Sequence, residues 1–277
     1  MYETGKLIQE LRIKAGFTQK SLADALHITD KAVSKWERGL SLPDITLLQK
    51  LSLLLDTDTD RLVATSIKQE KWVGLIDIHD CDFSQIIYDK PLVYYLLVHF
   101  QLLGMEEIYI LTEEMNKRFL QDEKFSKLGF IFIFEEPVEK NMMIINHPWF
   151  LFGSDLTEQF QGAMLSKRRI KLVPKNQEPI FLFSMNRESK FYFEDKKQFV
   201  RKASERTLGR GMVCLDMSDY NGALDVATFI RAYQQNSGLL IGDVEEIAYR
   251  NGMISKEQLL EYASIVPYGN LLREIPT

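Results

Sequence analysis

The chain has 277 residues, of which 45% are hydrophobic and 26% are charged, and its formal net charge is −5. These values are typical of a globular protein, and its longest apolar stretches are broken well before the ~20 residues that a membrane-spanning helix needs. Two cysteines, Cys81 and Cys214, cannot build a disulfide framework, and the N-terminus lacks the basic-then-apolar pattern of a signal peptide. We therefore expect a soluble, cytoplasmic protein with no membrane partner and with two domains, at residues 1–66 and 71–277.

Residues 17–40 have the pattern of two short helices joined by a turn. Thr18 and Thr29 stand where N-caps belong, so that each side-chain oxygen can accept a hydrogen bond from a first-turn amide. Apolar residues then recur at helical spacing, and the small Ala23 lets the second helix cross close to the first. The pattern predicts a helix-turn-helix, in which the solvent face of the second helix is available to base edges or phosphates. That face carries Asp30, Lys31, Ser34, Lys35 and Arg38.

This segment resembles the Cro and phage-repressor class of helix-turn-helix domains, the XRE family. The resemblance covers about residues 4–64 and rests on Thr18-Gln19, Ala23 and Trp36-Glu37-Arg38-Gly39. It implies an all-α domain of five helices, at about 4–15, 18–26 and 29–38, with a fourth after Pro43-Asp44 and a fifth from Asp58. It also implies a double-stranded DNA operator as partner, bound through Thr18, Gln19, Thr29, Asp30, Lys31, Ser34, Lys35 and Arg38.

Within that set, the resemblance places Asp30, Lys31 and Lys35 at base edges and Gln19 and Arg38 near phosphates. Residues 1–66 contain nine Lys or Arg and nine Asp or Glu. No strong basic patch therefore supplies non-specific affinity for DNA. We expect binding to depend on a paired site and on a homodimer or higher homo-oligomer. The simpler alternative is that these charges only solvate one face of a helix.

From Trp72 onward, short apolar runs alternate with helical patterns. Runs rich in Ile, Val and Phe are typical of buried strands, which we expect at residues 72–78, 108–112, 130–134, 142–146, 182–185 and 212–216. Helical spacing appears at residues 91–103, 155–166 and 222–235. The alternation predicts an α/β domain with helices on both faces of its sheet, joined to the first domain by a short polar linker at 64–71.

Three stretches of this second region resemble the sugar nucleotidyltransferases, in particular the glucose-1-phosphate thymidylyltransferases. The first begins at Tyr88-Asp89-Lys90-Pro91 and continues to residue 112, and the second is Phe152-Gly153-Ser154-Asp155-Leu156. The third extends from residue 209 to residue 270 and contains Glu245-Glu246-Ile247-Ala248-Tyr249-Arg250. The resemblance implies a Rossmann-like domain with a mixed sheet.

The catalytic parts of that family are missing from this chain. Phosphoryl transfer of this type needs the amides of a Gly-rich loop and a neighbouring base to hold a triphosphate. The loop at residues 79–84 has no glycine, no Lys or Arg stands between residues 71 and 90, and Asp77, Asp80 and Asp82 would repel the ligand. Of the family's aspartate pair only Asp216 remains, because residues 146–149 read Asn-His-Pro-Trp. We expect no catalytic activity; the alternative is an enzyme whose loop has been rebuilt.

The same segment carries residue types that bind zinc. Asp77, His79 and Cys81 alternate along it, so their side chains would share one side of an extended chain. Only these three ligands are in reach and no second cluster completes them, so we favour a polar loop and expect no metal and no cofactor. We expect the two cysteines to be small buried fillers and three histidines to be structural: His27, His99 and His147.

In the thymidylyltransferases, a second nucleotide pocket at a subunit interface mediates feedback inhibition by the thymidine-linked sugar product. At the positions that match its lining, this chain has Leu102, Phe152, Gly153, Gly211, Glu246 and Arg250, with Thr157 in place of a family histidine. The resemblance implies a site for a thymidine diphosphate sugar, in which Arg250 pairs with the diphosphate. The alternative is that the glutamates at 245 and 246 and Arg250 only form an i,i+4 pair that supports a dimer interface.

Together these patterns favour a transcriptional regulator. A protein that kept the product site and lost the catalytic one could report product level to a promoter, provided that the ligand binds one dimer geometry better than another. Our hypothesis is a DNA-binding domain fused to an inactive nucleotidyltransferase-like domain that dimerises and senses a nucleotide sugar. The alternatives are an active nucleotidyltransferase with a regulatory DNA-binding domain, and a regulator whose second domain is a ligand-free dimerisation scaffold.

Overall fold

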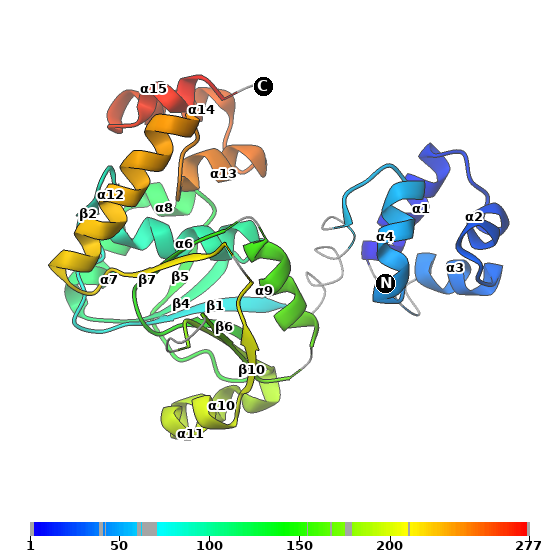
Figure 1. The fold of residues 1–277 in the computed structure, drawn as a ribbon, viewed down its shortest axis with the longest axis horizontal. Coiled ribbons are helices and arrows are strands. Elements are labelled where there is room, and N and C mark those ends of the chain that lie inside the picture. The colour runs from blue at the N-terminus through cyan, green and yellow to red at the C-terminus, as the bar shows by residue number, and fades with distance from the viewer. Residues whose placement is uncertain are drawn as a thin grey trace. The chain divides into compact units, whose positions relative to one another are not determined.

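The computed structural model describes residues 3–38, 41, 43–59, 62, 71–153, 155–166, 168–174, 179–209 and 211–275. The chain divides into two compact units, Met1–Lys71 and Trp72–Thr277 (Figure 1). Several features considered above lie outside the described residues: Gly39, most of the fifth helix, the linker at 64–70, Ser154 and Arg210.

Four helices form the described part of the first unit, and they match the first four predicted helices: α1 Glu3–Lys14, α2 Gln19–Leu26, α3 Asp30–Glu37 and α4 Ile45–Leu54. The Thr18 Oγ1 atom accepts a hydrogen bond from the Ser21 amide at 3.0 Å, and Thr29 Oγ1 accepts one from the Ala32 amide at 3.3 Å. Both predicted N-caps are therefore confirmed.

The core of the first unit gathers the apolar stripes of its helices. Leu22 and Val33 are fully buried, and the small Ala23 is buried between them and their neighbours. Helix α1 packs against the end of α3 through Gly5, where a Cβ atom would lie 2.2 Å from the carbonyl oxygen of Trp36. Only glycine allows this approach, which fixes α1 against the helix that carries the predicted reading residues.

The second unit is built on a mixed sheet of seven strands in the order β10-β8-β9-β6-β1-β4-β5. Strand β9 is antiparallel to both of its neighbours, and the other paired strands are parallel. The strands are β1 Trp72–Asp77, β4 Glu107–Leu111, β5 Ile131–Ile133, β6 Asn141–Ile145, β8 Ile170–Val173, β9 Phe181–Ser184 and β10 Ser204–Thr207. The predicted α/β class with a mixed sheet is confirmed.

Two small antiparallel ribbons accompany the main sheet: β2 Ile86–Ile87 with β3 Lys90–Pro91, and β7 Trp149–Phe152 with β11 Val213–Asp216. The sixth predicted strand is therefore real but lies outside the main sheet. The sequence analysis missed β2, β3, β7, β8 and β10. Strand β10 reads Ser-Glu-Arg-Thr and is exposed throughout, so it carries no apolar signal, and it is held by backbone pairing with β8.

Helices cover both faces of the main sheet, as predicted (Figure 1). The helices are α6 Leu92–Leu102, α7 Glu114–Leu120, α8 Glu123–Lys127, α9 Leu156–Leu165, α10 Asn186–Glu194, α11 Lys196–Lys202, α12 Tyr220–Ser237, α13 Val244–Arg250, α14 Lys256–Ile265 and α15 Gly269–Arg273. Helix α6 lies on one face with α13 packed beyond it, and α10 and α11 lie on the other.

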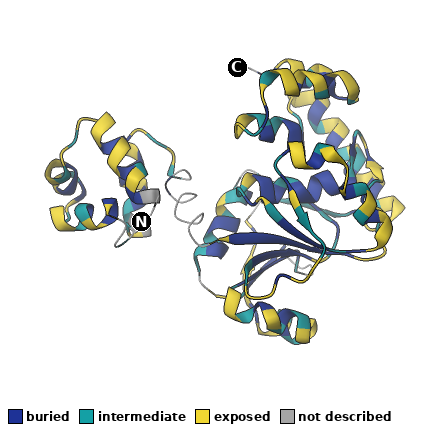
Figure 2. Cartoon of the chain, turned by 180° about the vertical axis from the view of Figure 1, so that it is seen from behind, coloured by how far each residue is buried: buried dark blue, intermediate teal, exposed yellow. Residues whose placement is uncertain are grey.

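Alternation along β1 divides its side chains between the two faces. Val73 and Leu75 join Tyr192 of α10 and Phe199 of α11 in one buried cluster. On the opposite face Gly74 leaves room for α6, because a Cβ atom there would lie 2.9 Å from the Phe100 ring. The inner strands of the sheet and much of α6 are buried, whereas the edge strands β5 and β10 and the outer helices are partly or fully exposed to solvent (Figure 2). The fold thus defines two places to examine for a functional site. One is at the carboxyl ends of β1 and β6, and the other is around α6 and α13.

Candidate functional site

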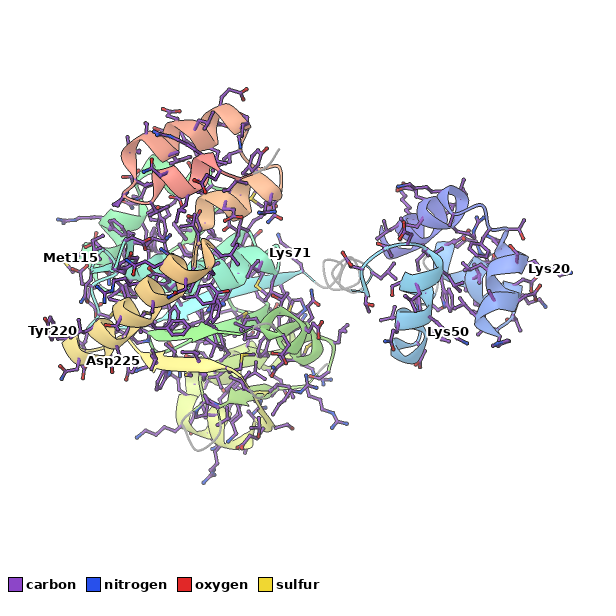
Figure 3. All side chains as sticks on the ribbon, turned by 45° about the horizontal axis from the view of Figure 1, so that its top comes forward. Lys20, Lys50, Lys71, Met115, Tyr220 and Asp225 are labelled. Atoms are coloured by element: carbon purple, nitrogen blue, oxygen red, sulfur yellow. The ribbon has the colours of Figure 1, made fainter. Side chains whose placement is uncertain are left out.

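A shallow hollow of about 360 Å³ lies over α2 and α3 of the first unit. It brings together six of the eight predicted DNA-binding residues, which we call the recognition face: Gln19, Asp30, Lys31, Ser34, Lys35 and Arg38. The other two, Thr18 and Thr29, are the N-caps of the helices that carry this face. A residue that the sequence analysis left out, the exposed Lys20, projects from α2 (Figure 3).

A buried ion pair supports the recognition face from behind. Arg12 Nε donates to Glu37 Oε1 at 2.5 Å, and Arg12 Nη1 donates to the carbonyl oxygen of Phe17 at 2.7 Å. Gln19 Nε2 donates to Glu37 Oε2 at 2.7 Å, so the side chain of Gln19 is held in place while it lines the face. Sequence periodicity could not show this pair, because its two residues are 25 positions apart.

In the second unit, a cavity of about 310 Å³ lies among α6, β7, α9 and α13, and we call it the α6–α13 cavity. It brings together five of the six predicted ligand residues: Leu102, Phe152, Gly153, Glu246 and Arg250. Thr157 also lines it, whereas Gly211 does not. At Gly153 a Cβ atom would lie 1.9 Å from the sulfur of Met212, so a side chain there would force Met212 away from the rim.

The two adjacent glutamates of α13 have different surroundings. Glu246 faces the cavity and accepts hydrogen bonds from Arg250 at 2.7 Å from Nε and 2.6 Å from Nη2. Glu245 is buried and accepts from the hydroxyls of Tyr94 at 3.0 Å and Tyr268 at 3.1 Å. The predicted i,i+4 pair is present between Glu246 and Arg250, and both of its members also line the cavity.

A second cavity of about 730 Å³ lies beyond the carboxyl end of β6, and we call it the carboxyl-end cavity. It is lined by Asn146, His147, Trp149, Pro179, Lys196, Lys197, Val200 and Asp216. Lys196 Nζ lies 2.6 Å from Asp77 Oδ2, and the Tyr192 hydroxyl donates to the same oxygen at 2.5 Å. The loop after β1 lacks a base, as the sequence indicated, but helix α11 brings two lysines to this region from far along the chain.

His147 does not stand alone in its loop, as the sequence suggested, but lies beside a carboxylate; its expected structural role stays a prediction. Its Nε2 atom lies 2.8 Å from Asp216 Oδ1. Partial burial alone would raise the pKa of Asp216, but hydrogen bonds from His147 and from the amide of Ser218 lower it below its usual value. Asp216 is therefore an ionised carboxylate at neutral pH.

The segment considered for zinc has other partners. His79 Nδ1 lies 3.2 Å from Glu113 Oε1, and Asp77 contacts Tyr192 and Lys196. Burial and the nearby acidic side chains raise the pKa of the Cys81 thiol to about 11, so it is protonated at neutral pH. Over the described part of the chain, no three or more His, Cys, Asp or Glu residues are arranged to hold a metal ion.

The comparisons with known proteins match the two units of the chain to different proteins. Residues 8–62 match the family model described as helix-turn-helix. The HTH-type transcriptional regulator ImmR of Bacillus subtilis (strain 168) is 44% identical over 59 residues, which cover 21% of this chain and 46% of that protein. The glucose-1-phosphate thymidylyltransferase of Mycobacterium tuberculosis (strain ATCC 25618 / H37Rv) is 38% identical over 71 residues, or 24% of this chain and 25% of the enzyme.

Among solved structures, a putative glucose-1-phosphate thymidylyltransferase from Bacillus anthracis in complex with a sucrose matches with a TM-score of 0.45 and 8% identity, over 58% of this chain and 95% of that one. The chain spans only about a quarter of the length of the thymidylyltransferases that it matches in sequence. No helix among the described residues is both long and apolar enough to cross a membrane. The N-terminal region is a helix-turn-helix domain of the XRE type, and the C-terminal region resembles glucose-1-phosphate thymidylyltransferase.

Proposed function

We propose that this chain is a sequence-specific DNA-binding transcriptional regulator whose second unit is a catalytically inactive, dimeric sensor of a nucleotide sugar. The likeness of residues 8–62 to bacterial HTH-type regulators supports the DNA-binding part. The recognition face supports it independently, because it presents Lys31, Lys35 and Arg38 together on one solvent-facing surface. Such side chains contact phosphates and base edges in the major groove.

The observation that carries the sensor part is the composition of the α6–α13 cavity. Residues from the end of α6, the end of β7 and one side of α13 meet there, although they come from positions 102 to 250 of the chain. They combine apolar walls with an arginine, which is the side chain best suited to hold a diphosphate. Leu102 is 48% exposed beside this cavity, which supports a subunit interface at the same place.

The carboxyl-end cavity supports the proposal of inactivity. Two of the groups that a reaction would need already have partners, since Lys196 pairs with Asp77 and Asp216 accepts a hydrogen bond from His147. A triphosphate would have to compete with Asp77 for Lys196, and a metal ion would have to compete with His147 for Asp216. A catalytic site instead aims its charges at the groups that react.

Titration calorimetry and DNA-binding assays test this function on the full chain. The operator is first obtained by selection from random duplex DNA, and thymidine diphosphate glucose is then titrated with and without it. We expect binding of the nucleotide sugar and a change in operator affinity, and the two effects must be equal because coupling is reciprocal. If selection enriches no DNA sequence, the regulator assignment is wrong. If the sugar does not bind at millimolar concentration, the second unit is a scaffold.

An active nucleotidyltransferase is the second candidate, and one observation favours it. Lys196, Lys197 and Asp216 line the same large cavity, so basic side chains are present where the sequence alone showed none. The test is pyrophosphate release with Mg²⁺, a panel of sugar 1-phosphates and each nucleoside triphosphate. We expect none above background. Turnover that Asp216→Asn abolishes would replace the inactive-domain proposal with the enzyme.

A further inference from the structure

Two buried polar side chains in the α6–α13 cavity are not used by the function proposed above. The cavity wall is mostly apolar, and its aromatic residues Phe150 and Phe160 are almost fully buried. His99 and Asp243 line the same space and are each only 3% exposed. Neither was among the ligand residues predicted from the sequence, and His99 was expected to be structural.

His99 lies on α6 and has no hydrogen-bond partner at either ring nitrogen among the described residues. The rings of Phe160 and Phe181 stand edge-on to it, with centroids 5.6 and 5.3 Å away. Burial lowers the pKa of His99 to about 3, so the ring is neutral at pH 7. A neutral imidazole offers one N–H donor and one nitrogen acceptor, and here both are unused.

Asp243 is the N-cap of α13, where its Oδ1 atom accepts a hydrogen bond from the Glu246 amide at 2.6 Å. Its Oδ2 atom is buried and has no hydrogen-bond partner among the described residues. Burial and the neighbouring Glu245 raise the pKa of Asp243 well above its usual value. The raised pKa favours the protonated carboxyl group, in which Oδ2 can act as a donor.

Two residues that carry three buried polar atoms without partners in the described chain thus line one largely apolar cavity. Leaving such atoms unpaired costs free energy, and apolar side chains of the same size would avoid that cost. A ligand that completes these hydrogen bonds would remove that free-energy cost. In contrast, the charged Arg250 at the same cavity has a side chain that is 57% exposed.

We propose that His99 and Asp243 recognise the base of the nucleotide sugar, an uncharged ring that carries an N–H group next to a carbonyl oxygen, as a pyrimidine dione does. The acceptor nitrogen of His99 accepts a hydrogen bond from the N–H group of the base, and Asp243 Oδ2 donates one to the adjacent carbonyl oxygen. The phosphates then extend toward Arg250 and the sugar toward solvent. This inference rests on the proposed sensor function and adds to it the orientation of the ligand and its base specificity.

Binding of four probes to the full chain tests the orientation. With the base inside the cavity, thymidine diphosphate should bind within about tenfold of thymidine diphosphate glucose, because the sugar contributes little. Uridine diphosphate glucose has the same ring edge and should also bind. Adenosine diphosphate glucose presents a different edge and a larger ring, and it should bind at least roughly a hundredfold more weakly.

Three variants test the two residues. His99→Leu should weaken thymidine diphosphate glucose by at least about tenfold and should raise the melting temperature, because it removes two buried atoms without partners. Asp243→Ser keeps a capping oxygen for α13 but removes Oδ2, and it should weaken binding by a similar factor. Asp243→Asn keeps both the cap and a donor at that place, and its affinity should stay within about threefold of wild type.

The outcomes separate this inference from the sensor proposal. If thymidine diphosphate glucose binds and all three variants bind it equally well, His99 and Asp243 are structural and the sensor proposal stands. A lower melting temperature for His99→Leu with unchanged affinity leads to the same conclusion. If binding depends on both residues but never alters operator affinity, the base-recognition inference holds and the sensor is wrong. If no probe binds wild type at millimolar concentration, both are wrong.

Discussion

The recognition face of the first unit and the α6–α13 cavity of the second present polar groups in opposite ways. On the recognition face, Lys31 and Lys35 are charged side chains at the surface, and the buried charges of Arg12 and Glu37 are paired with each other behind it. In the cavity, His99 and Asp243 are buried, and burial shifts both pKa values toward the uncharged form. The two ring nitrogens of His99 and Oδ2 of Asp243 have no hydrogen-bond partner in the described chain.

This difference indicates two kinds of ligand. Exposed charges in water each contribute little and are screened by salt, so they suit a polyanion that makes many contacts at once. Buried polar atoms without partners contribute more per contact and are insensitive to salt, so they suit a small ligand that leaves water. We therefore expect DNA affinity to fall steeply with salt and affinity for the nucleotide base to change little.

The largest effect should follow from removing the buried partner behind the recognition face. Arg12→Ala leaves Glu37 buried with only Gln19 as a hydrogen-bond donor, and it should lower the unfolding free energy of the first unit by about 3–5 kcal/mol. Urea denaturation measures this loss when it is followed by fluorescence in a chain with Trp72→Phe and Trp149→Phe, so that only Trp36 reports. The double variant Arg12→Met/Glu37→Leu should recover most of it, since an apolar pair needs no partner. If Arg12→Ala unfolds like wild type, the pair does not support the face.

At the cavity, Arg250→Ala should weaken thymidine diphosphate glucose by about 1.5–3 kcal/mol, roughly ten- to a hundredfold, because a charge-assisted phosphate contact is lost. Titration calorimetry measures the change. Arg273→Ala, at the end of α15 and away from the cavity lining, is the matched control and should bind normally. An equal loss in both variants would mean that general charge, rather than the cavity, holds the ligand.

On the recognition face, Lys31→Ala or Lys35→Ala should cost about 1–3 kcal/mol of operator affinity if the lysine contacts a base edge. If it contacts a phosphate instead, the slope of log affinity against log salt should fall by about 0.9. The control is Lys50→Ala on α4, outside the recognition face (Figure 3). Folding should be unchanged in all three, since these side chains are exposed. Normal operator binding by both face variants would mean that α3 is not the reading helix.

The last effect is absent at neutral pH and should appear only in the pH dependence of stability. His99 has a pKa of about 3 in the fold, against 6.5 in its ordinary state, so below pH 6.5 the unfolded chain binds a proton that the folded chain does not. Stability from this group is therefore present above pH 6.5 and is lost as the pH falls toward 3. Between those values wild type should lose up to about 1.4 kcal/mol per pH unit more than His99→Leu. Urea melts of both proteins at pH 7 to 4 measure the difference, and equal slopes would show that His99 has the same pKa in the folded and unfolded chains.

The recognition face could be predicted almost completely, because its residues are close together in the sequence. Once Thr18 and Thr29 cap their helices, the 3.6-residue period alone determines which side chains share the outer surface. The five strands of the main sheet that carry apolar runs were predicted for the same local reason. Strand β8 was missed because Lys171 interrupts its apolar run, and β10 was missed because it is exposed and polar, so that pairing and not composition makes them strands.

For the second unit, the amino-acid sequence by itself determined the α/β class and, through the resemblance, five residues of one cavity. Only the tertiary structure decided that Lys196 lies beside Asp77 and that His147 lies beside Asp216. It also decided that His99 and Asp243, which are far apart in the sequence, line one cavity. The reason is physical. Periodicity shows which face of an element is buried, but the partners on that face depend on how distant helices and strands pack together. Polar atoms without a partner become visible only when every neighbour is in place.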